Sequence, residues 1–471
     1  MWQPQNSIIH FVGIGGIGIS GIAKLMHGLG YKVQGSDIAA NSNTKRLADM
    51  GIKIFISHKP ENAATASCVV ISSAVNKENP EVAHAIANKI PVISRSQMLA
   101  ELMRLKTSIA ISGSHGKTTT TSMVANLFKH NNLNPTVCIG GIMNDTDANA
   151  YLGSSQYFIV EADESDATFI KIPASIAVIT NIDPEHLDFY HSFDNLLSSF
   201  KTFITNLPFY GFAVCCLDHE RVSALVQQTH ERKIITYGID NEQAQVRAVN
   251  IKYYDYHSVF DVVANLNSNR ILIESLTLSV PGKHNILNNL AAISIGLELD
   301  FGVKSLVESA RSFNGVQRRF TKIASFQGAD VIDDYAHHPE EIKATLAAAK
   351  LIARNRSSKV LSVFQPHRYT RLRDLFEHFA LSFQDADVVY ITDVYSAGEE
   401  RIDGFSAQHL VDEINQIQRS CSANKTRLAR YLPLTQEDIL LALTSDVEEQ
   451  DVVVMMGAGN ISNFVKQLFH V

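Results

Sequence analysis

Short hydrophobic runs alternate with amphipathic stretches along the whole chain, a pattern typical of β-strands separated by α-helices. In a first block, which ends near residue 106, the hydrophobic runs predict strands at residues 8–14, 32–35, 53–56, 68–72 and 91–94. The stretches between them, such as residues 19–29 and 80–88, have helical spacing. This strand–helix order predicts a parallel sheet.

A second block opens with the apolar run at residues 108–112 and continues to about residue 313. Further strands are predicted in it at residues 157–162, 177–180 and 211–217. Between residues 244 and 280, apolar and polar positions alternate and are broken by Asn and Ser. This segment predicts an antiparallel hairpin attached to the main sheet.

The third block repeats the pattern, with strands predicted at residues 331–334, 359–364, 387–392 and 452–456 between amphipathic helices. We therefore predict an α/β protein of three domains, at residues 1–106, 107–313 and 314–471. The first and third domains are predicted to be Rossmann-like. The central domain is predicted to hold a P-loop-type, mononucleotide-binding ATPase sheet.

The composition agrees with a folded protein of this size. Of the 471 residues, 45% are hydrophobic and 19% are charged, and the length fits about three globular domains. With 41 Lys and Arg against 48 Asp and Glu, the net charge is -7, and no long basic run is present. This balance argues against nucleic acid as a partner. Nothing in the sequence indicates an oligomeric state.

The sequence also lacks the marks of a membrane or secreted protein. No apolar run approaches the ~18 residues that span a bilayer, and the N-terminus has no basic stretch of the secretory type. The five cysteines have neither CxxC nor zinc-site spacing, so we expect reduced, buried thiols. We therefore expect a cytoplasmic protein that is not inserted in a membrane.

Gly13, Gly15 and Gly18 form a G-x-G-x-x-G motif between a predicted strand and a predicted helix, and Asp37 closes the next strand. Glycine lets the backbone approach a pyrophosphate at a helix N-terminus, where the amides and the helix dipole favour an anion. The spacing matches dinucleotide-binding enzymes such as NAD-dependent dehydrogenases. A tight strand-to-helix turn that needs glycine is an equally good interpretation of this motif alone.

A more specific motif, Gly-Ser-His-Gly-Lys-Thr-Thr, occupies residues 113–119 between an apolar run and a helical segment. It is a shortened phosphate loop, because the strict pattern places glycine where this chain has Ile111. The amides of such a loop cradle phosphates, Lys117 reaches the β and γ groups, and the Thr118 hydroxyl holds Mg²⁺. We predict that the loop binds ATP.

Acidic residues gather where the next strand of this block ends. Within six positions the chain has Glu161, Asp163, Glu164 and Asp166. Four carboxylates at the ligand-binding edge of an α/β sheet favour a cation, and Mg²⁺ takes hard oxygen ligands. A solvated acidic loop is the alternative interpretation. The following strand ends in a similar polar segment, which contains His186.

Further polar residues follow downstream. His284 and Asn288 lie one turn apart at the start of a predicted helix, where Asn288 suits the edge of an adenine or, more simply, the start of the helix. The third block adds basic side chains near its strand ends, namely Arg319, His337, Arg368 and Arg371. Because the planar fork of arginine binds carboxylates and phosphates bidentately, these residues predict anionic reactants.

In chain order, the segments GIGGIG, GSHGKTTT, EADESD, TNIDPEH, GKHNILN, RRF, DDYAHHP, PHRYTR and MGAGN resemble those of the Mur ligases of peptidoglycan synthesis. The resemblance spans nearly the whole chain. It implies an N-terminal UDP-sugar domain, a central ATPase domain and a C-terminal domain that carries the incoming amino acid. The segments at residues 364–371, 394–400 and 456–460 are similar to the members that attach L-alanine to UDP-N-acetylmuramate.

The resemblance also implies roles for single residues. The UDP-sugar would lie against Gly13, Gly15, Gly16, Gly18, Asp37, Ser72 and Ser73. ATP would bind at Gly113, Ser114, His115, Gly116, Lys117, Thr118 and Thr119, with His284 and Asn288 beside the adenine. Thr118 and Glu161 would bind one Mg²⁺, and Glu161 with His186 a second. Catalysis would rest on Lys117, Glu161, His186, Arg319, His337 and Arg368, with Arg368 and Arg371 holding the amino acid.

The implied reaction consumes ATP, UDP-N-acetylmuramate and L-alanine, and passes through an acyl phosphate to an amide, ADP and phosphate. A sibling ligase that adds a peptide to the same sugar is the nearest alternative. An NAD-dependent dehydrogenase would leave the phosphate loop unexplained, and a binding protein switched by ATP would form no amide. Some related ligases carry a carbamylated lysine shortly after the histidine that corresponds to His186. Lys201 lies in that region of this chain, but we interpret it as an ordinary helix lysine that faces solvent.

Overall fold

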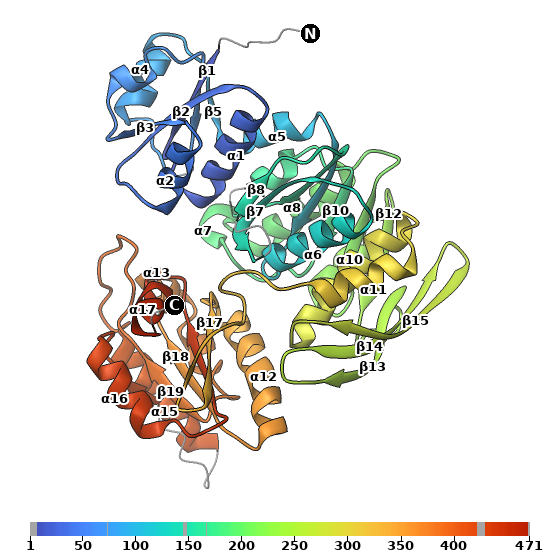
Figure 1. Cartoon of the computed structure of the whole chain (residues 1–471), viewed down its shortest axis with the longest axis vertical. Helices are drawn as coiled ribbons and strands as arrows, with labels where there is room; N and C mark the ends of the chain where they lie inside the picture. The colour runs from blue at the N-terminus through green and yellow to red at the C-terminus, as the bar shows by residue number, and fades with distance from the viewer. Residues whose placement is uncertain (1–6, 73, 145–147, 166, 422–428, 470–471) are drawn as a thin grey trace. The chain divides into compact units, whose positions relative to one another are not determined.

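The computed structural model describes residues 7–72, 74–144, 148–165, 167–421 and 429–469. The chain forms two compact units. The first comprises the chain up to Val249 with Asp261–Leu276 and Leu287–Phe313, and the second comprises Asn250–Phe260, Thr277–Ile286 and the chain from Asn314 onward. Three β-sheets with flanking helices organise these units (Figure 1). The predicted α/β fold with three sheets is confirmed.

The first sheet, blue in Figure 1, has five parallel strands in the order β3-β2-β1-β4-β5. The strands are β1 (Ile8–Val12), β2 (Lys32–Asp37), β3 (Lys53–Ile56), β4 (Cys68–Ile71) and β5 (Val92–Ser94). The helices are α1 (Ile17–Gly28), α2 (Ser42–Asp49), α3 (Pro60–Ala63), α4 (Pro80–Ala87) and α5 (Arg95–Met103). The strand order reverses between β1 and β4, which is where α/β sheets bind ligands.

The central sheet has ten strands in the order β15-β14-β13-β12-β11-β10-β6-β9-β7-β8. The strands are β6 (Thr107–Ser112), β7 (Thr136–Met143), β8 (Ala148–Tyr151), β9 (Tyr157–Glu161), β10 (Ile176–Ile179), β11 (Phe212–Cys216), β12 (Lys233–Gly238), β13 (Val246–Tyr253), β14 (Ser258–Leu266) and β15 (Asn269–Leu278). The helices are α6 (Lys117–His130), η1 (Thr168–Lys171), α7 (Leu187–Tyr190), α8 (Phe193–Thr205), α9 (Glu220–Gln227), α10 (Lys283–Glu298) and α11 (Val303–Ser312). Parallel strands β9 and β10 flank β6, so the ends of all three meet at one edge.

The central sheet differs from its prediction in the segment at residues 244–280 and in strands that were not predicted. Residues 244–280 form three neighbouring strands, β13, β14 and β15, instead of one hairpin. Asn267 and Ser268, with φ values of 51° and 65°, form a two-residue turn that joins β14 to β15 in addition to the turn between β13 and β14. The sequence analysis also missed β7, β8 and β12. In β7, Gly140 and Gly141 lower the strand propensity.

The third sheet has six strands in the order β16-β17-β21-β18-β19-β20, and only the β16–β17 pair is antiparallel. The strands are β16 (Thr321–Phe326), β17 (Ala329–Asp334), β18 (Val360–Phe364), β19 (Val388–Ile391), β20 (Ala429–Tyr431) and β21 (Val452–Met456). The helices are α12 (Pro339–Arg356), α13 (Tyr369–Asp374), α14 (Phe376–Ala380), α15 (Ala407–Cys421), α16 (Gln436–Asp446) and α17 (Ile461–Phe469).

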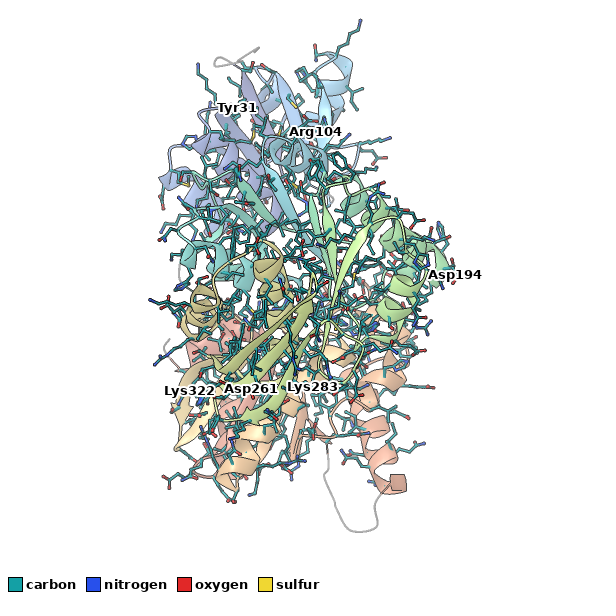
Figure 2. All side chains as sticks on the ribbon, turned by 90° about the vertical axis from the view of Figure 1, so that its right-hand side faces the viewer. Tyr31, Arg104, Asp194, Asp261, Lys283 and Lys322 are labelled. Carbon is teal, nitrogen blue, oxygen red and sulfur yellow. The ribbon has the colours of Figure 1, made fainter. Side chains whose placement is uncertain are left out.

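Apolar side chains fill the space between sheets and helices, whereas charged ones such as Arg104 and Asp194 are exposed (Figure 2). This division is expected from the hydrophobic effect. Among the helices that the structure describes, none combines the length and the apolar character that a membrane span requires.

Candidate active site

The predicted phosphate loop connects the end of β6 to the start of α6. Its outer glycines have left-handed backbones, with φ of +132° at Gly113 and +81° at Gly116. A Cβ atom on Gly113 would lie 2.9 Å from the backbone oxygen of Asn181, and one on Gly116 would lie 2.6 Å from Asn288 Oδ1. Both positions therefore require glycine, for conformation and for space.

The segment after β10 holds this loop. The His115 N–H donates to Asn181 Oδ1 (2.7 Å), while Asn181 Nδ2 (3.1 Å) and Thr180 Oγ1 (2.7 Å) donate to the His115 carbonyl. The Asp183 N–H donates to Ser114 Oγ at 2.8 Å. Sequence reasoning assigned no role to Thr180 or Asn181. Their place at the end of a strand beside β6 was the signal that could have found them.

Lys117, the first residue of α6, points back into the loop. Its Nζ donates to the carbonyl oxygens of Gly113 (2.6 Å) and Ser114 (3.0 Å) and to Glu164 Oε1 (2.8 Å). Burial opposes the charge, but neighbouring carboxylates, led by that of Glu164, raise the pKa of Lys117 above its ordinary value. The loop therefore contains a permanent positive charge.

Thr118 and Glu161 lie together at the start of α6. Thr118 Oγ1 donates to Glu161 Oε2 at 2.9 Å, and the Gly140 N–H donates to the same oxygen at 2.8 Å. Strand β9 runs beside β6, which brings its last residue to the phosphate loop. A hydroxyl and a carboxylate are oxygen donors of the kind that Mg²⁺ takes, so this predicted pair fits the ion.

His186 lies with two carboxylates. Its Nε2 is 4.0 Å from Glu164 Oε1 and 3.7 Å from Glu185 Oε2, and the ligand atoms of the three residues lie within 4.8 Å of one another. Glu164 is 2% exposed, and its Oε2 has no hydrogen-bond partner among the described residues. A buried carboxylate with one unpaired oxygen, grouped with an imidazole and a second carboxylate, fits a divalent cation. The structure thus pairs Glu161 with Thr118 and groups His186 with Glu164 and Glu185.

Asp183 connects the phosphate loop to the end of β11. Its carboxylate oxygens lie 3.2 Å from His115 Nε2 and 3.3 Å from His219 Nε2. Burial acts in the opposite direction, but the two imidazoles lower the pKa of Asp183 below its usual range. The side chain of His115 is therefore held by a carboxylate, in addition to the bonds made by its backbone.

Asn288, in α10, is buried against the phosphate loop. Thr120 Oγ1 donates to Asn288 Oδ1 at 3.1 Å. His284 lies one turn earlier in the same helix, where burial, assisted by the charge of Arg319, lowers the pKa of His284 to about 4. His284 is therefore neutral at pH 7, and the predicted place of both residues beside an adenine stays a prediction.

The first glycine loop connects β1 to α1. Gly13 has a φ of +77°, and its N–H donates to the Ser36 carbonyl at 2.8 Å. The Gly16 N–H donates to the Gly13 carbonyl (3.1 Å), and the Gly15 N–H donates to Asp37 Oδ2 (2.7 Å). A dinucleotide-binding enzyme directs this acidic residue at a ribose, whereas here the carboxylate is bonded to the loop itself.

Neighbouring segments lie close to the same loop. A Cβ atom on Gly18 would collide with the guanidinium of Arg95, and one on Gly13 would lie 3.2 Å from Ser72 Cβ. Ser73 lies outside the described residues. The structure therefore brings the glycine loop and Ser72 to one edge of the first sheet, and their role toward a UDP-sugar, which the resemblance implies, stays a prediction.

The buried carboxylate of Glu81 supports the first glycine loop through Ser36. Glu81 accepts hydrogen bonds from Asn62 Nδ2 (2.6 Å) and from the Ser36 hydroxyl, and it lies 3.1 Å from His10 Nε2. Burial favours the neutral acid, but these three partners together lower the pKa of Glu81 to about 2. Because the Ser36 carbonyl accepts from Gly13, this network fixes the base of the loop.

Three of the predicted basic residues of the third block meet at the carboxyl edge of their sheet. His337 follows β17, and Arg368 and Arg371 follow β18. The His337 and His367 rings lie 6.2 Å apart, and Arg371 Nη1 lies 3.3 Å from His367 Nδ1. Burial first, and then the charge of Arg371, lower the pKa values of both histidines to about 4. Both are therefore neutral at pH 7.

Arg368 is held by its backbone, and its side chain is exposed. It has a φ of +69°, and its N–H donates to the Tyr395 carbonyl at 2.8 Å. The next turn is capped from another loop, because Glu399 accepts the Thr370 N–H (3.0 Å) and the Thr370 hydroxyl (2.7 Å). Arg319 lies in the same unit, with its guanidinium carbon 5.2 Å from the centre of the Tyr335 ring.

Comparisons with known proteins agree with this architecture. Three family models match the chain: Mur ligase family, catalytic domain (residues 8–107), Mur ligase middle domain (residues 111–296) and Mur ligase, glutamate ligase domain (residues 318–459). The UDP-N-acetylmuramate--L-alanine ligase of Rickettsia bellii is 58% identical to the chain over 462 residues, which cover 98% of this chain and 95% of that protein.

Two solved structures extend the comparison. A UDP-N-acetylmuramate-alanine ligase from Thermotoga maritima matches with a TM-score of 0.80 and 30% identity over 98% of both chains. A murein peptide ligase from Psychrobacter arcticus shares the fold, with a TM-score of 0.69 and 22% identity over 98% of both chains. The chain therefore belongs to the Mur ligase family.

Proposed function

We propose that this protein is an ATP-dependent ligase that joins L-alanine to the lactyl carboxylate of UDP-N-acetylmuramate, with release of ADP and phosphate. One observation carries the proposal. A chain that is similar over nearly its full length to L-alanine ligases also has a phosphate loop with a buried Lys117 and a Thr118–Glu161 pair. The product would be a precursor of peptidoglycan.

The chemistry accounts for the types of residue at the site. A carboxylate accepts an amine poorly because oxide is a poor leaving group, so ATP first converts it to an acyl phosphate. Phosphoryl transfer needs positioning and charge neutralisation more than a protein nucleophile. In this proposal Lys117 neutralises the transferred phosphoryl group, and the amide N–H groups of the loop hold the other phosphates.

The later step requires neutral nitrogen and stabilisation of an oxyanion. The α-amine of L-alanine attacks the acyl phosphate, and the tetrahedral intermediate carries a negative oxygen that cationic groups stabilise. We assign Arg319 and His337 to these reactants, and Arg368 and Arg371 to the carboxylate of the amino acid. The low pKa of His337 leaves it neutral, so it serves as a hydrogen-bonding group at pH 7.

We further propose that Mg²⁺ is required. Thr118 and Glu161 would hold one ion, and His186 with its carboxylate neighbours Glu164 and Glu185 would hold a second. When bound, such ions neutralise phosphate charge and align the transferring group. Glu161 was also predicted to contact the second ion, and this shared role remains part of the proposal.

The first sheet would bind the UDP-sugar. The glycine loop at residues 13–18, with Asp37, Ser72 and Ser73, would face its diphosphate and sugar. We keep residues 1–106, 107–313 and 314–471 as the proposed domain boundaries. We also propose a cytoplasmic location, since ATP and UDP-sugars are made and used there.

Mass spectrometry of the reaction products tests the proposal directly. The protein would be incubated with UDP-N-acetylmuramate, ATP, Mg²⁺ and an equimolar mixture of L-alanine, glycine and L-serine. We expect one molecule of ADP for each UDP-N-acetylmuramoyl-L-alanine formed. A parallel reaction with the peptide L-alanyl-γ-D-glutamyl-diaminopimelate tests the alternative. An amide product only with that peptide would replace L-alanine as the substrate, and no ADP in either reaction would reject a ligase.

A further inference from the structure

All three N–H groups of the Lys117 ammonium have hydrogen-bond acceptors in this structure. The acceptors are the Gly113 carbonyl at 2.6 Å, the Ser114 carbonyl at 3.0 Å and Glu164 Oε1 at 2.8 Å. To donate to a phosphate, Lys117 must therefore give up at least one of these partners. Glu164 is the charged one, so it is the partner whose loss has the largest electrostatic consequence.

Loss of the Lys117 partner would be unfavourable for the buried carboxylate of Glu164. Its side chain is 2% exposed, and the residue lies three positions after the end of β9. Among the described residues, Oε1 is bonded to Lys117 and Oε2 has no hydrogen-bond partner. Departure of Lys117 would leave a buried carboxylate without a compensating charge, which is strongly unfavourable. A divalent cation bound to Glu164 would supply a positive partner in place of the ammonium.

The ligands for such a cation are already next to Glu164. Glu185 and His186 place their ligand atoms within 4.8 Å of that of Glu164, and His186 Nε2 is 4.0 Å from the same Oε1 that Lys117 holds. His186 has a left-handed backbone with φ of +56°, at the start of α7. The His186 imidazole thus lies near the oxygen that Lys117 holds, and the Glu185 carboxylate belongs to the same group of potential ligands.

We propose that Glu164 is a positioning residue shared in turn by Lys117 and a divalent cation, so that cation binding at Glu164, Glu185 and His186 releases Lys117 toward the nucleotide. The inference deepens the proposed function, on which it rests, by linking the proposed cation site to Lys117 through Glu164. Without the cation, Glu164 holds Lys117 within the loop. With the cation, the carboxylate keeps a positive partner while Lys117 turns to the phosphates. Cation affinity and nucleotide affinity are then coupled through the protein, in both directions.

Nucleotide binding without metal provides the first test. ATP would be titrated calorimetrically in EDTA into the wild-type protein, Glu164→Gln and Asp163→Asn. Asp163→Asn is the matched control. The negative charge of Asp163 also raises the pKa of Lys117, but its Oδ1 accepts the Ser165 N–H at 3.0 Å. If Glu164 restrains Lys117, metal-free ATP binding should tighten about 10-fold in Glu164→Gln and change less than about 3-fold in Asp163→Asn.

Cation binding without nucleotide provides the second test. Mn²⁺ would be titrated by electron paramagnetic resonance into the wild-type protein, Lys117→Met, Glu164→Gln and the double variant. Removal of the competing ammonium should tighten Mn²⁺ binding about 10-fold in the wild-type background and leave it unchanged in the Glu164→Gln background. Circular dichroism of each variant confirms that it is folded.

The outcomes are distinct. Equal effects of Glu164→Gln and Asp163→Asn on metal-free ATP binding would reduce Glu164 to a general negative charge and overturn the inference. The same conclusion follows if Lys117→Met tightens Mn²⁺ binding equally in both backgrounds. Failure of the wild-type protein to bind ATP in Mg²⁺ would instead overturn the proposed function.

Discussion

The two glycine loops of the first unit each connect a parallel strand to a helix, but they hold opposite charges. In the loop after β1, the amide of Gly15 is bonded to the carboxylate of Asp37. In the loop after β6, the carbonyls of Gly113 and Ser114 are bonded to the ammonium of Lys117. Glycine spacing therefore specifies the path of the backbone, and the side chain that lies in the loop specifies the chemistry.

The buried carboxylates near these loops differ in the same way. Glu81, below the first loop, has several donors that lower its pKa to about 2. Glu164, beside the second loop, has one ammonium partner and other acids nearby, and burial raises its pKa to about 7. The first network is complete and therefore structural, whereas the second is incomplete and therefore able to exchange partners.

The largest expected effect is at the second loop. Lys117→Ala removes the positive charge beside the transferred phosphoryl group, and turnover should fall ~10² to 10³-fold, as on loss of a preformed oxyanion donor. ADP release under saturating substrates measures it. Lys129→Ala, in the exposed last turn of the same helix, is the control and should stay within about 2-fold of wild type. Similar turnover for the two variants would remove the functional difference between the loops.

The two buried carboxylates should respond oppositely to pH. The folded-state pKa of Glu81 is about 2, below its ordinary value of 4.5, so its contribution to stability is present above pH 4.5 and is lost as the pH falls toward 2. Glu164 has a raised pKa, so its contribution falls as the pH rises from 4.5 to 7. The Glu81 contribution amounts to at most about 3 kcal/mol.

Denaturant unfolding between pH 3.5 and 7.5 measures these contributions. Relative to wild type, Glu81→Gln should lose less stability on acidification below pH 4.5, and Glu164→Gln should lose less as the pH rises toward 7. If both variants change the pH profile in the same direction, the contrast between a complete and an incomplete network is wrong.

The variant Arg368→Ala tests whether the third sheet contributes to ligation independently of substrate binding at the two glycine loops. Arg368→Ala should leave ATP and UDP-N-acetylmuramate binding nearly unchanged. If its guanidinium holds the L-alanine carboxylate, ligation should lose at least about 2 kcal/mol, roughly 30-fold, through a raised KM for L-alanine or a lowered kcat. Steady-state kinetics and calorimetry separate these quantities. Collapse of ATP affinity with an unchanged L-alanine dependence would assign Arg368 to a different subsite.

Glycine replacements compare the loop backbones. Gly113→Ala forces a Cβ atom into a left-handed backbone and against Asn181, so the variant should lose about 1 to 3 kcal/mol of unfolding free energy and its ATP binding. A Cβ atom on Gly16 would lie no closer than 3.4 Å to its neighbours, so Gly16→Ala should lose less than about 1 kcal/mol. Chemical denaturation checks both values, and the reverse order would contradict the geometry.

The smallest effect is expected at the carboxylate of the first loop. Asp37→Asn keeps the shape of the side chain and weakens its bond to the Gly15 N–H, which should cost about 0.5 to 1.5 kcal/mol. We expect a KM for UDP-N-acetylmuramate raised about 2- to 10-fold, with the KM for ATP unchanged. An equal rise in both KM values would mean that the two loops are not independent.

Local patterns in the sequence were sufficient for the three-sheet α/β architecture and for the phosphate loop, but not for every strand. The conformation of Gly113–Lys117 was predictable because glycine, lysine and a preceding apolar strand are neighbours in the chain. The pairing of Lys117 with Glu164 was not predictable, because it joins residues 47 positions apart and depends on the register of β9 against β6. The grouping of His186 with Glu164 instead depends on where the segment after β10 turns.

Irregular segments were also beyond sequence reasoning. The turn at Asn267 and Ser268 made three strands where one hairpin was predicted, because the Asn and Ser breaks in residues 244–280 were interpreted as a single turn. The capping of α13 by Glu399 joins segments 29 residues apart and follows no local pattern. Roles assigned by resemblance, such as those of His284 and Asn288 beside an adenine, stay predictions.

The capping of α13 has a consequence for how this fold tolerates change in loop length. α13 is only six residues long, and its first turn depends on a carboxylate supplied by the loop after β19. That loop is also tied to Arg368 through the Tyr395 carbonyl, four residues before Glu399. One inserted residue between Tyr395 and Glu399 would move the cap out of register while the Arg368 bond stayed in place. This short stretch should therefore keep a constant length in functional descendants of the chain, although it lies in a surface loop, where insertions are normally accepted.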